Sequence, residues 1–386
     1  MKILIVEPYY TGSHALWAEG YKKNSRHDVE ILSLPGRYWK WRMHGGAVTL
    51  AARFLAEGVR PDLILATDML DLSTFLALTG PLSHGIPTAI YFHENQFTYP
   101  WHPDDRERRR GRDGHYGFIN FVSALAADRV FFNSAYHRGS FLEGLQGYLE
   151  RSPEFESALY IDIIRKKSTV LYVGMDFKAL DSAAAEAPVF SESPDRPPLI
   201  LWNHRWEHDK NPEEFFRALY LLMERGCEFE VAIMGESFRK SSAVFHEAIE
   251  RLGERVVHSG FVEDFSDYAA WLKRADILPV TSSHDFFGCS VVEAIYCGCF
   301  PLLPRALAYP EHLPDNGGNG GGEGGEAVDM CFYDDFKGLM NGLSWALDNI
   351  EEIRKTSLKD QVSRYGWERL APLYDSEMER AGRAKA

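Results

Sequence analysis

The sequence predicts an α/β protein with two doubly wound domains. Short apolar runs alternate with stretches of helical periodicity, a pattern typical of parallel sheets covered by helices. The alternation is interrupted once, by a stretch rich in Ala, Ser, Glu and Pro, and then resumes. A chain of 386 residues also suits about two domains. Because ligands of such sheets bind at the carboxyl ends of strands, we expect the domains to face each other across a cleft.

Residues 1–178 are expected to form the first domain. Its strands and helices alternate along the chain, as they do in successive βαβ units. The predicted strands are Ile3–Val6, Val29–Leu32, Leu63–Ala66, Thr88–Phe92, Arg129–Phe132 and Thr169–Val173. The predicted helices are Ser13–Lys23, Ala47–Gly58, Leu72–His84 and Ile119–Ala127.

Residues 179–198 are expected to be a linker, and residues 199–358 the second domain. Residues 359–386 are expected to be a helical segment that crosses back to the first domain. The predicted strands of the second domain are Leu199–Trp202, Glu230–Met234, Val256–Phe261, Ala275–Val280 and Phe300–Leu303. Its predicted helices are Asn211–Arg225, Ser241–Leu252, Tyr268–Lys273 and Ser290–Cys297.

Composition narrows the classes of function. The formal net charge of −14 argues against a general binder of nucleic acid or anionic membrane, but it leaves room for a local basic patch. The five cysteines are few and odd in number, which favours reduced thiols in a cytoplasmic protein. The apolar start Met1–Val6 indicates a strand rather than a signal peptide, and no run reaches the roughly 20 apolar residues of a membrane span. We therefore expect no membrane partner.

The segment His284–Ala294 carries the strongest functional pattern. Asp285 and Glu293 bracket a glycine turn at Gly288, which leads from the predicted strand Ala275–Val280 into a predicted helix. A strand, a glycine turn and a helix start direct backbone N–H groups and the positive end of the helix dipole at an anion. This pattern suits a diphosphate, with the carboxylates accepting hydrogen bonds from sugar hydroxyls.

The same segment has a structural interpretation. Ser290 and Glu293 have the spacing of a capping box, with Ser at the N-cap and Glu at the third helical position. The segment alone does not decide between the two interpretations. They are also compatible, since Ser290 can cap a helix whose N-terminus binds a diphosphate.

Two cations follow the first strand of the second domain. Arg205 and Lys210 lie in the loop after Leu199–Trp202, where an arginine fork and a lysine point charge suit a diphosphate. The alternative is a solvated loop in which Glu207 and Asp209 pair with these cations.

Two weaker signals lie at neighbouring strand ends. Gly235 follows the predicted strand Glu230–Met234, where it either approaches a ligand or merely ends the strand. Phe261 and Val262 precede a polar helix start, where backbone edges are available to a nucleobase.

In combination these elements are more specific than any one of them. Arg205-x4-Lys210, the strand ending at Gly235, Gly260-Phe261-Val262 and Asp285-x7-Glu293 follow one another in order. This order resembles the nucleotide-sugar domain of retaining glycosyltransferases with the GT-B fold, in which two Rossmann-like domains face each other across a cleft. That family usually has Glu where Asp285 stands, and its later Gly-x-Pro is one residue longer here, at Gly298–Pro301.

Motifs in the first domain narrow the resemblance. The motifs are Glu7–His14, Tyr91–Pro100 and Asn133–Tyr136, joined in the second domain by Phe286–Gly288, Tyr296–Pro301 and Tyr309–Glu311. They resemble the tRNA-queuosine α-mannosyltransferase family over residues 1–175 and 198–315. The resemblance implies retaining transfer of mannose from GDP-mannose to the cyclopentene-diol of queuosine in the anticodon of tRNA-Asp.

These patterns assign roles on the donor side. His93, Asp285, Arg205 and Lys210 are the expected catalytic residues, with the two cations stabilising the departing diphosphate. The expected donor-binding residues are Gly12, Ser13, Arg205, Lys210, Gly235, Phe261, Val262, Phe287, Gly288, Cys289, Ser290 and Glu293. The alternative for Ser13 is a helix N-cap. No Asp-x-Asp element stands in a suitable loop, so we expect no metal and no other cofactor.

The acceptor side is expected in the first domain. The expected acceptor-binding residues are Glu7, His14, Glu94, Asn95, Gln96, Arg108, Arg109 and Arg110. Arg106–Arg112 holds five arginines that suit tRNA phosphates, although a solvated charged loop is the alternative. Phe97, Tyr99 or Trp101 are candidates for stacking an extruded base.

Two other functions remain open from the sequence. One is a retaining GT-B glycosyltransferase that uses another nucleotide sugar or another acceptor, such as a lipid or a polysaccharide. The other is a non-catalytic protein that binds tRNA or a sugar nucleotide. Arg205, Lys210, Asp285 and Glu293 together argue against the non-catalytic alternative.

Overall fold

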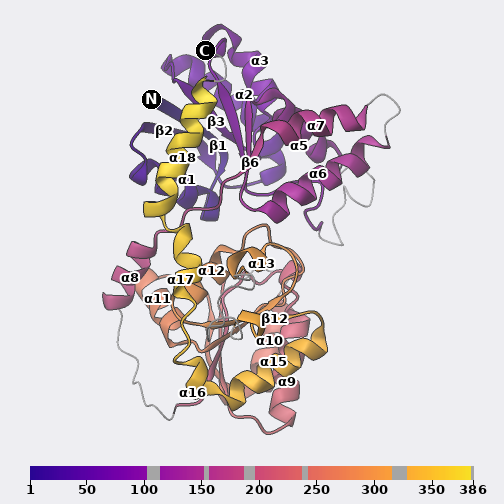
Figure 1. Cartoon of the computed structure of the whole chain (residues 1–386), viewed down its shortest axis with the longest axis vertical. Helices are drawn as coiled ribbons and strands as arrows, with labels where there is room; N and C mark the ends of the chain where they lie inside the picture. The colour runs from indigo at the N-terminus through magenta and orange to yellow at the C-terminus, as the bar shows by residue number, and fades with distance from the viewer. Residues whose placement is uncertain (102–113, 152–155, 187–195, 237–241, 315–327, 384–386) are drawn as a thin grey trace, which may run out of the picture. The chain divides into compact units, whose positions relative to one another are not determined.

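The computed structural model describes residues 1–101, 114–151, 156–186, 196–236, 242–314 and 328–383. The chain divides into two compact units. The first unit is Met1–Met175 together with Tyr365–Ala386, and the second is Asp176–Arg364. Each unit contains its own parallel sheet with helices packed against it (Figure 1).

The first unit is built on a sheet with the strand order β2-β1-β3-β4-β5-β6. The strands are β1 Lys2–Tyr10, β2 Asp28–Pro35, β3 Leu63–Thr67, β4 Thr88–Phe92, β5 Arg129–Phe132 and β6 Ser168–Val170. Every pairing is parallel, and β3 and β4 are buried along their whole lengths. Such continuous apolar strands are typical of a sheet covered on both faces. The six strands predicted for this domain are therefore confirmed.

Helices cover this sheet. They are α1 Gly12–Asn24, α2 Trp39–Glu57, α3 Leu72–Ser83, α5 Gly114–Ala126, α6 Ala135–Leu149, α7 Ser157–Lys167 and α18 Trp367–Gly382. The last helix, α18, lies beside α1 although the two come from opposite ends of the chain (Figure 1). There Trp17 Nε1 donates to Tyr374 Oη at 3.0 Å.

The second unit has the strand order β12-β11-β10-β7-β8-β9. The strands are β7 Leu199–Trp202, β8 Glu230–Met234, β9 Val256–Gly260, β10 Ile277–Pro279, β11 Phe300–Pro304 and β12 Phe332–Tyr333. The helices are α8 Phe177–Glu186, α9 Pro212–Glu224, α10 Ser242–Leu252, α11 Phe265–Arg274, α12 Cys289–Tyr296, α13 Tyr309–His312, α15 Phe336–Asp348, α16 Ile350–Ile353 and α17 Lys359–Val362. Short 3₁₀ turns occupy His208–Lys210, Gly253–Arg255 and Ser363–Tyr365.

The expected linker is partly helical. Residues 179–186 belong to α8, which packs against α11 in the second unit. Phe177 stacks on Tyr296 with ring centroids 3.8 Å apart, because the apolar positions of this Ala-rich segment share one helical face. Residues 187–195 lie outside the described residues.

Other boundaries also differ from the prediction. Helix α2 begins at Trp39 instead of Ala47, because Trp39 and Met43 extend its packed face toward the N-terminus. Helices α6 and α7 were not predicted. Of the segment 359–386, the described residues from Tyr365 onward belong to the first unit and residues 359–364 to the second.

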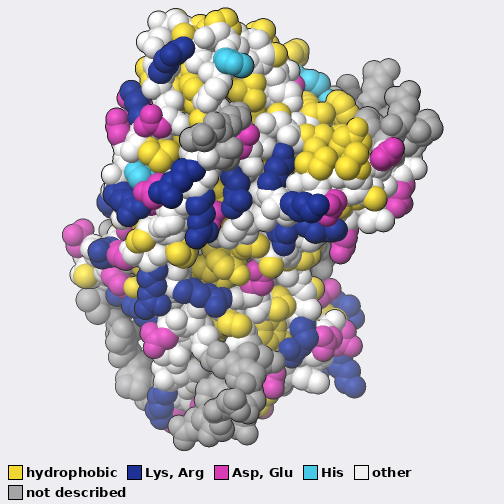
Figure 2. All heavy atoms as spheres, turned by 45° about the horizontal axis from the view of Figure 1, so that its top comes forward, with side chains coloured by type: hydrophobic (Ala, Val, Ile, Leu, Met, Phe, Trp, Pro, Cys, Tyr) yellow, Lys and Arg dark blue, Asp and Glu magenta, His cyan; other side chains and the backbone are white. Residues whose placement is uncertain are grey.

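The surface is not uniformly acidic. Figure 2 shows a face on which Lys and Arg side chains gather among hydrophobic and acidic side chains, although the chain has a net charge of −14. An anionic partner can therefore be attracted by a local group of basic side chains, although the net charge is negative. Among the described residues, no helix has the length and apolarity that crossing a membrane requires.

Candidate functional site

A buried ion pair lies at the carboxyl edge of the second unit's sheet. Lys210, in the loop after β7, is only 7% exposed. Its Nζ lies 3.1 Å from Asp285 Oδ2 and 3.3 Å from Asp209 Oδ2, and it donates to the carbonyl oxygen of His284 at 3.0 Å. Because strands β7 and β10 are neighbours, the loops that follow them meet at this point.

Both partners of this pair are charged. Burial disfavours the ammonium form of Lys210, but Asp285 and Asp209 outweigh burial and raise its pKa. Burial likewise disfavours the Asp285 carboxylate, but Lys210 and the Tyr309 hydroxyl lower its pKa. Tyr309 donates to Asp285 Oδ2 at 2.6 Å. The carboxylate of Asp285 is thus held in one position by two donors.

The α12 terminus differs from a capping box. The N-cap residue is Gly288, in the left-handed region with φ 86°, and the helix has no side-chain cap. Ser290 therefore lies inside the first turn, where its Oγ is 3.2 Å from His204 Nδ1. The capping-box interpretation of Ser290 and Glu293 is wrong. The first N–H groups of a helix have no acceptor within it, so those of Cys289 and Ser290 are of the kind that can bind an anion.

Glu293 faces a tyrosine rather than the helix terminus. Tyr268, from α11, donates to Glu293 Oε2 at 2.7 Å. Burial raises the pKa of Glu293 to about 7, and the Tyr268 hydroxyl opposes part of that rise. Glu293 is therefore close to half protonated at neutral pH.

Arg205, at the same edge, is more exposed than Lys210. Its side chain is 52% exposed, and its guanidinium lies 3.2 Å from the carboxylate of Glu207. The salt bridge to Glu207, which the sequence offered as the alternative interpretation of this loop, is thus present. Its exposure leaves the guanidinium accessible to a bound phosphate.

Four other predicted donor residues have different surroundings. Gly235 has φ 129°, and a Cβ there would lie 2.0 Å from the carbonyl oxygen of His204. This close backbone approach is sufficient to explain the glycine, which favours its structural interpretation. Phe261 is 64% exposed, while Val262 is half-buried. Phe287 is buried, and its carbonyl oxygen lies 2.6 Å from His312 Nε2.

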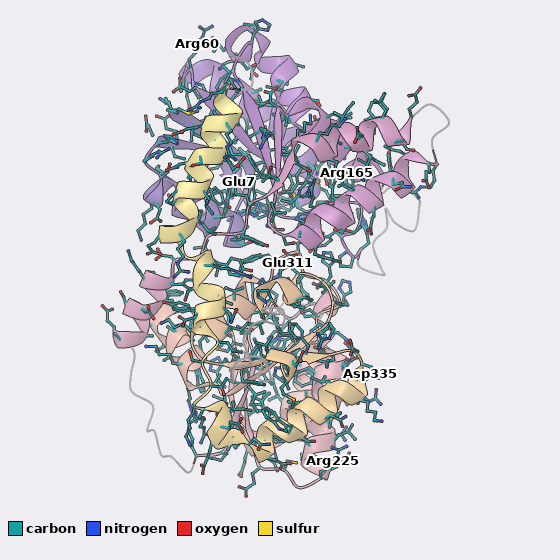
Figure 3. All side chains as sticks on the ribbon, viewed as in Figure 1. Glu7, Arg60, Arg165, Arg225, Glu311 and Asp335 are labelled. Atoms are coloured by element: carbon teal, nitrogen blue, oxygen red, sulfur yellow. The ribbon has the colours of Figure 1, made fainter. Side chains whose placement is uncertain are left out.

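The first unit holds a buried carboxylate–histidine pair. Glu7, near the end of β1, is fully buried (Figure 3). Its Oε1 accepts from the backbone N–H of Tyr9 at 2.7 Å, and its Oε2 lies 3.0 Å from His14 Nδ1. Both carboxylate oxygens are thus engaged within the unit. We therefore assign Glu7 the positioning of His14 instead of direct contact with an acceptor.

His14 and His93 are in opposite charge states. Burial lowers the pKa of His14, but Glu7, with Asp68 and Glu94, outweighs burial and raises it to about 9. Burial and the charge of His14 hold the pKa of His93 well below its usual value. The ring centroids of His14 and His93 are 4.1 Å apart. His93 is 8% exposed, and its buried Nε2 has no hydrogen-bond partner among the described residues.

The loop after His93 is shaped by its own side chains. Asn95 is fully buried, and its Oδ1 accepts from the backbone of Phe97 and Thr98, each at 3.1 Å. Gln96 donates to Glu94 Oε1 at 2.8 Å. We therefore infer that Asn95 holds the conformation of this loop and does not contact the acceptor directly.

The first helix begins close to this cluster. Gly12 has φ 49° and an open space around its Cβ position, and the N-cap of α1 is Thr11 without a side-chain cap. The alternative in which Ser13 caps this helix is wrong, because Ser13 lies inside the first turn. The predicted Arg108, Arg109 and Arg110 lie outside the described residues.

Some residues of these sites had no role in the sequence analysis. Asp68 follows β3 and accepts from the backbone N–H of His93 at 2.8 Å. Its place after an apolar strand was the available signal. Tyr309 belongs to the Tyr309–Glu311 motif, but the sequence did not indicate the contact that it or Tyr268 makes, because a hydroxyl contact depends on the fold of two distant segments.

A metal site is conceivable in the first unit. Ligand atoms of Glu7, His14 and His93 all lie within 4.8 Å of one another. A histidine must be neutral to bind a metal, however, and Glu7 keeps His14 protonated at neutral pH. Binding of a metal would therefore have to displace the proton of His14.

Replacing Glu7 by glutamine is expected to remove a pH-dependent part of the stability. The pKa of His14 is about 9 against an ordinary 6.5, so its protonation stabilises the folded state below pH 6.5, and this contribution is lost as the pH rises through 9. The shift corresponds to roughly 3 kcal/mol. The free energy of unfolding in urea between pH 6 and pH 9.5 measures it. Glu57→Gln, at the exposed end of α2, is the control, and an unchanged pH slope in Glu7→Gln would contradict the assignment.

Comparison with known proteins defines the class. A model described as tRNA-queuosine alpha-mannosyltransferase N-terminal matches residues 2–175, and one described as glycosyl transferases group 1 matches residues 185–320. Sucrose-phosphate synthase from Thermosynechococcus elongatus has a TM-score of 0.69 at 14% identity, covering 98% of both chains. A UDP-forming trehalose-phosphate synthase from Burkholderia xenovorans has a TM-score of 0.64 at 13% identity, covering 99% of this chain and 98% of that one. The protein is a glycosyltransferase with the GT-B fold.

Similar sequences identify the family. The tRNA-queuosine alpha-mannosyltransferase of Drosophila melanogaster is 36% identical over 315 residues, which are 81% of this chain and 81% of the relative. The GDP-mannose:cellobiosyl-diphosphopolyprenol alpha-mannosyltransferase of Xanthomonas oryzae is 21% identical over 78% of this chain and 70% of the relative. The chain belongs to the tRNA-queuosine α-mannosyltransferase family, and it is a hexosyltransferase.

Proposed function

We propose that the protein transfers mannose from GDP-mannose to the cyclopentene-diol of queuosine in the anticodon of tRNA-Asp, with retention at the anomeric carbon. The observation that carries the proposal is the 36% identity to the Drosophila tRNA-queuosine alpha-mannosyltransferase over 81% of both chains. The names of two further relatives specify GDP-mannose, which supports this donor. The free thiols of all five cysteines suit a cytoplasmic location.

We assign donor binding to the second unit. The bond between the anomeric carbon and the diphosphate breaks, and its electron pair leaves with the diphosphate. Arg205 and the first N–H groups of α12 are placed to stabilise the charge that develops there. Lys210 is engaged by Asp209 and Asp285, so its contribution is to hold the Asp285 carboxylate for the sugar hydroxyls.

We assign acceptor binding to the first unit. A hydroxyl of the diol forms the new bond to the anomeric carbon and gives up its proton. His93 is neutral, and its Nε2 has no partner among the described residues, so it can exchange a hydrogen bond with a sugar or acceptor hydroxyl. The imidazolium of His14 lies against His93 and favours negative charge nearby.

Transfer is expected to need no divalent metal. The cationic groups of the donor side and the protonated His14 supply the positive charge that a metal would otherwise supply. The initial rate in excess EDTA should equal the rate in buffer alone. A rate restored only by added Mg²⁺ or Mn²⁺ would contradict this part of the proposal.

Donor affinity is expected to fall as the pH is lowered. The pKa of Glu293 is about 7, and only its carboxylate accepts hydrogen bonds from both ribose hydroxyls. Between pH 8 and pH 6 the ionised fraction falls about tenfold, and the affinity for GDP-mannose should follow it. Calorimetric titration measures the affinity, and Glu293→Gln should bind weakly at both pH values. An equal pH dependence in this variant would assign the effect to another group.

The function is tested by offering donors and acceptors in parallel. The protein is incubated with GDP-mannose or a UDP-hexose, and with queuosine-containing tRNA or a polyprenyl diphosphate-linked sugar. A gain of one hexose on queuosine with GDP-mannose alone is expected. Transfer only to the lipid-linked acceptor would indicate the other glycosyltransferase, and donor binding without transfer to any acceptor would indicate the non-catalytic protein.

A further inference from the structure

Aromatic and basic side chains alternate at the start of α2. The segment Arg37-Tyr38-Trp39-Lys40-Trp41-Arg42 lies between Glu30 and Glu57, and the sequence has no other Asp or Glu between those two residues. In a chain with a net charge of −14, this makes a local region of positive charge. The roles assigned above to the two units do not use this segment.

Two of its rings are presented to solvent. Tyr38 is 77% exposed and Trp41 is 73% exposed. Tyr38 is the N-cap of α2 and has φ 55°, a left-handed conformation that bulky residues rarely adopt. The fold thus holds two large rings in water at the N-terminal end of one helix. Exposed aromatic groups of this kind mark interaction surfaces.

Trp39, in the same segment, is packed against other aromatic side chains. Trp39 packs against Trp101 and Tyr116, with ring centroids 5.7 and 5.1 Å apart. The Lys40 ammonium lies 5.5 Å from the Trp39 ring centroid and 5.1 Å from that of Trp101. Cation–π contacts of this length hold the ammonium over the two indole rings. A positive charge, carried by the residue between Trp39 and Trp41, therefore lies over these packed rings.

Trp39, in the same segment, also connects to the predicted acceptor residues through the core of the unit. Tyr9 and Trp39 pack against one buried cluster, which includes Met43 and Tyr116. Tyr9 in turn lies edge-on to His14, with ring centroids 5.8 Å apart. Trp39 is thus connected to the His14 cluster through packed side chains of the first unit alone.

We propose that the Arg37–Arg42 surface, with Trp101, binds unpaired nucleotides of the tRNA anticodon loop beside the modified base. Single-stranded RNA is read by stacking bases on aromatic rings and by pairing phosphates with Lys and Arg, and this surface offers both groups. Its link through Tyr9 to His14 favours RNA over a membrane, because the reacting nucleotide must reach the acceptor residues. The inference rests on the proposed function and specifies how that acceptor is held.

The experiment compares the double variant Tyr38→Ala/Trp41→Ala with the wild type. The ligand is an anticodon stem–loop that contains queuosine, and its affinity is measured by fluorescence anisotropy. Base stacking on an aromatic ring suggests that the dissociation constant rises about 10- to 100-fold. Tyr38→Phe/Trp41→Phe should retain most of the affinity. Arg37→Ala should reduce the slope of the logarithm of the affinity against the logarithm of salt concentration by the amount that corresponds to about one phosphate contact. Calorimetric affinity for GDP-mannose should not change in any of these variants.

Further measurements distinguish failure of this inference from failure of the proposed function. Leu159→Ala, which truncates a 51% exposed apolar side chain elsewhere in the same unit, is the control and should bind as the wild type does. If the wild type transfers mannose to tRNA and the double alanine variant binds and reacts equally well, this inference fails while the proposed function stands. Anionic phospholipid vesicles are tested in parallel by sedimentation. Loss of vesicle binding with unchanged RNA affinity would assign the surface to a membrane and overturn the inference.

Discussion

Replacing Arg205 by alanine is expected to lower kcat by about 10²- to 10³-fold, the usual cost of removing one donor that stabilises a developing negative charge. Arg205 lies in the loop after β7, at the edge where α12 begins, and its side chain is 52% exposed. Because this side chain is half in water and its ion pair with Glu207 lies at the surface, the free energy of unfolding should change by less than about 1 kcal/mol.

The measurement is steady-state transfer of hexose to queuosine tRNA, together with denaturation in urea. Arg225→Ala is the matched control, because Arg225 lies at the C-terminal end of α9 (Figure 3), whereas Arg205 belongs to the loop that precedes this helix. Arg205→Lys should be intermediate, since lysine keeps the charge but not the fork. A kcat within threefold of the wild type in Arg205→Ala would remove Arg205 from the catalytic residues.

Replacing Lys210 by methionine is expected to have the largest effect on stability. The substitution leaves Asp209 and Asp285 without their cation in a place where Lys210 is 7% exposed. Removing one partner of a buried ion pair typically costs about 3–5 kcal/mol, because the remaining charge is buried unpaired. Activity should also fall steeply, since Asp285 loses one of the two donors that fix its carboxylate.

Urea denaturation at neutral pH measures this cost. Lys359→Met is the matched control, because Lys359 pairs with Asp181 at 3.4 Å in the same unit but is 43% exposed. Its loss should cost less than about 1 kcal/mol. If the two variants lose similar amounts of stability, the buried cluster around Lys210 does not have the energetic role assigned to it.

The sheets could be predicted because their signal is local. Each central strand is a short apolar run, such as Leu63–Thr67 or Leu199–Trp202, and every residue in these two runs is buried. The start of α2 could not be predicted in the same way. Its first turn consists of Trp, Lys and Arg, and its packing depends on the contact of Trp39 with Trp101, which is distant in the sequence.

The residue types of the site were predictable, but their partners were not. The spacing of Asp285 and Glu293 indicated a ligand site, yet it could not show that Tyr309 and Tyr268 donate to them. Glu7 was expected to contact the acceptor, whereas both its oxygens are engaged by Tyr9 and His14. A carboxylate after a strand carries the same sequence signal whether it binds a ligand or orients a neighbour.

The central claim is that this glycosyltransferase modifies queuosine in tRNA-Asp with mannose. Its most direct test is to incubate the protein with GDP-mannose and total tRNA, either containing or lacking queuosine, and to analyse the nucleosides of each purified tRNA by mass spectrometry. The account predicts one added hexose, released as mannose on hydrolysis, on the queuosine of tRNA-Asp alone. A hexose on tRNA that lacks queuosine, a sugar other than mannose, or no gain on queuosine-containing tRNA-Asp would contradict it.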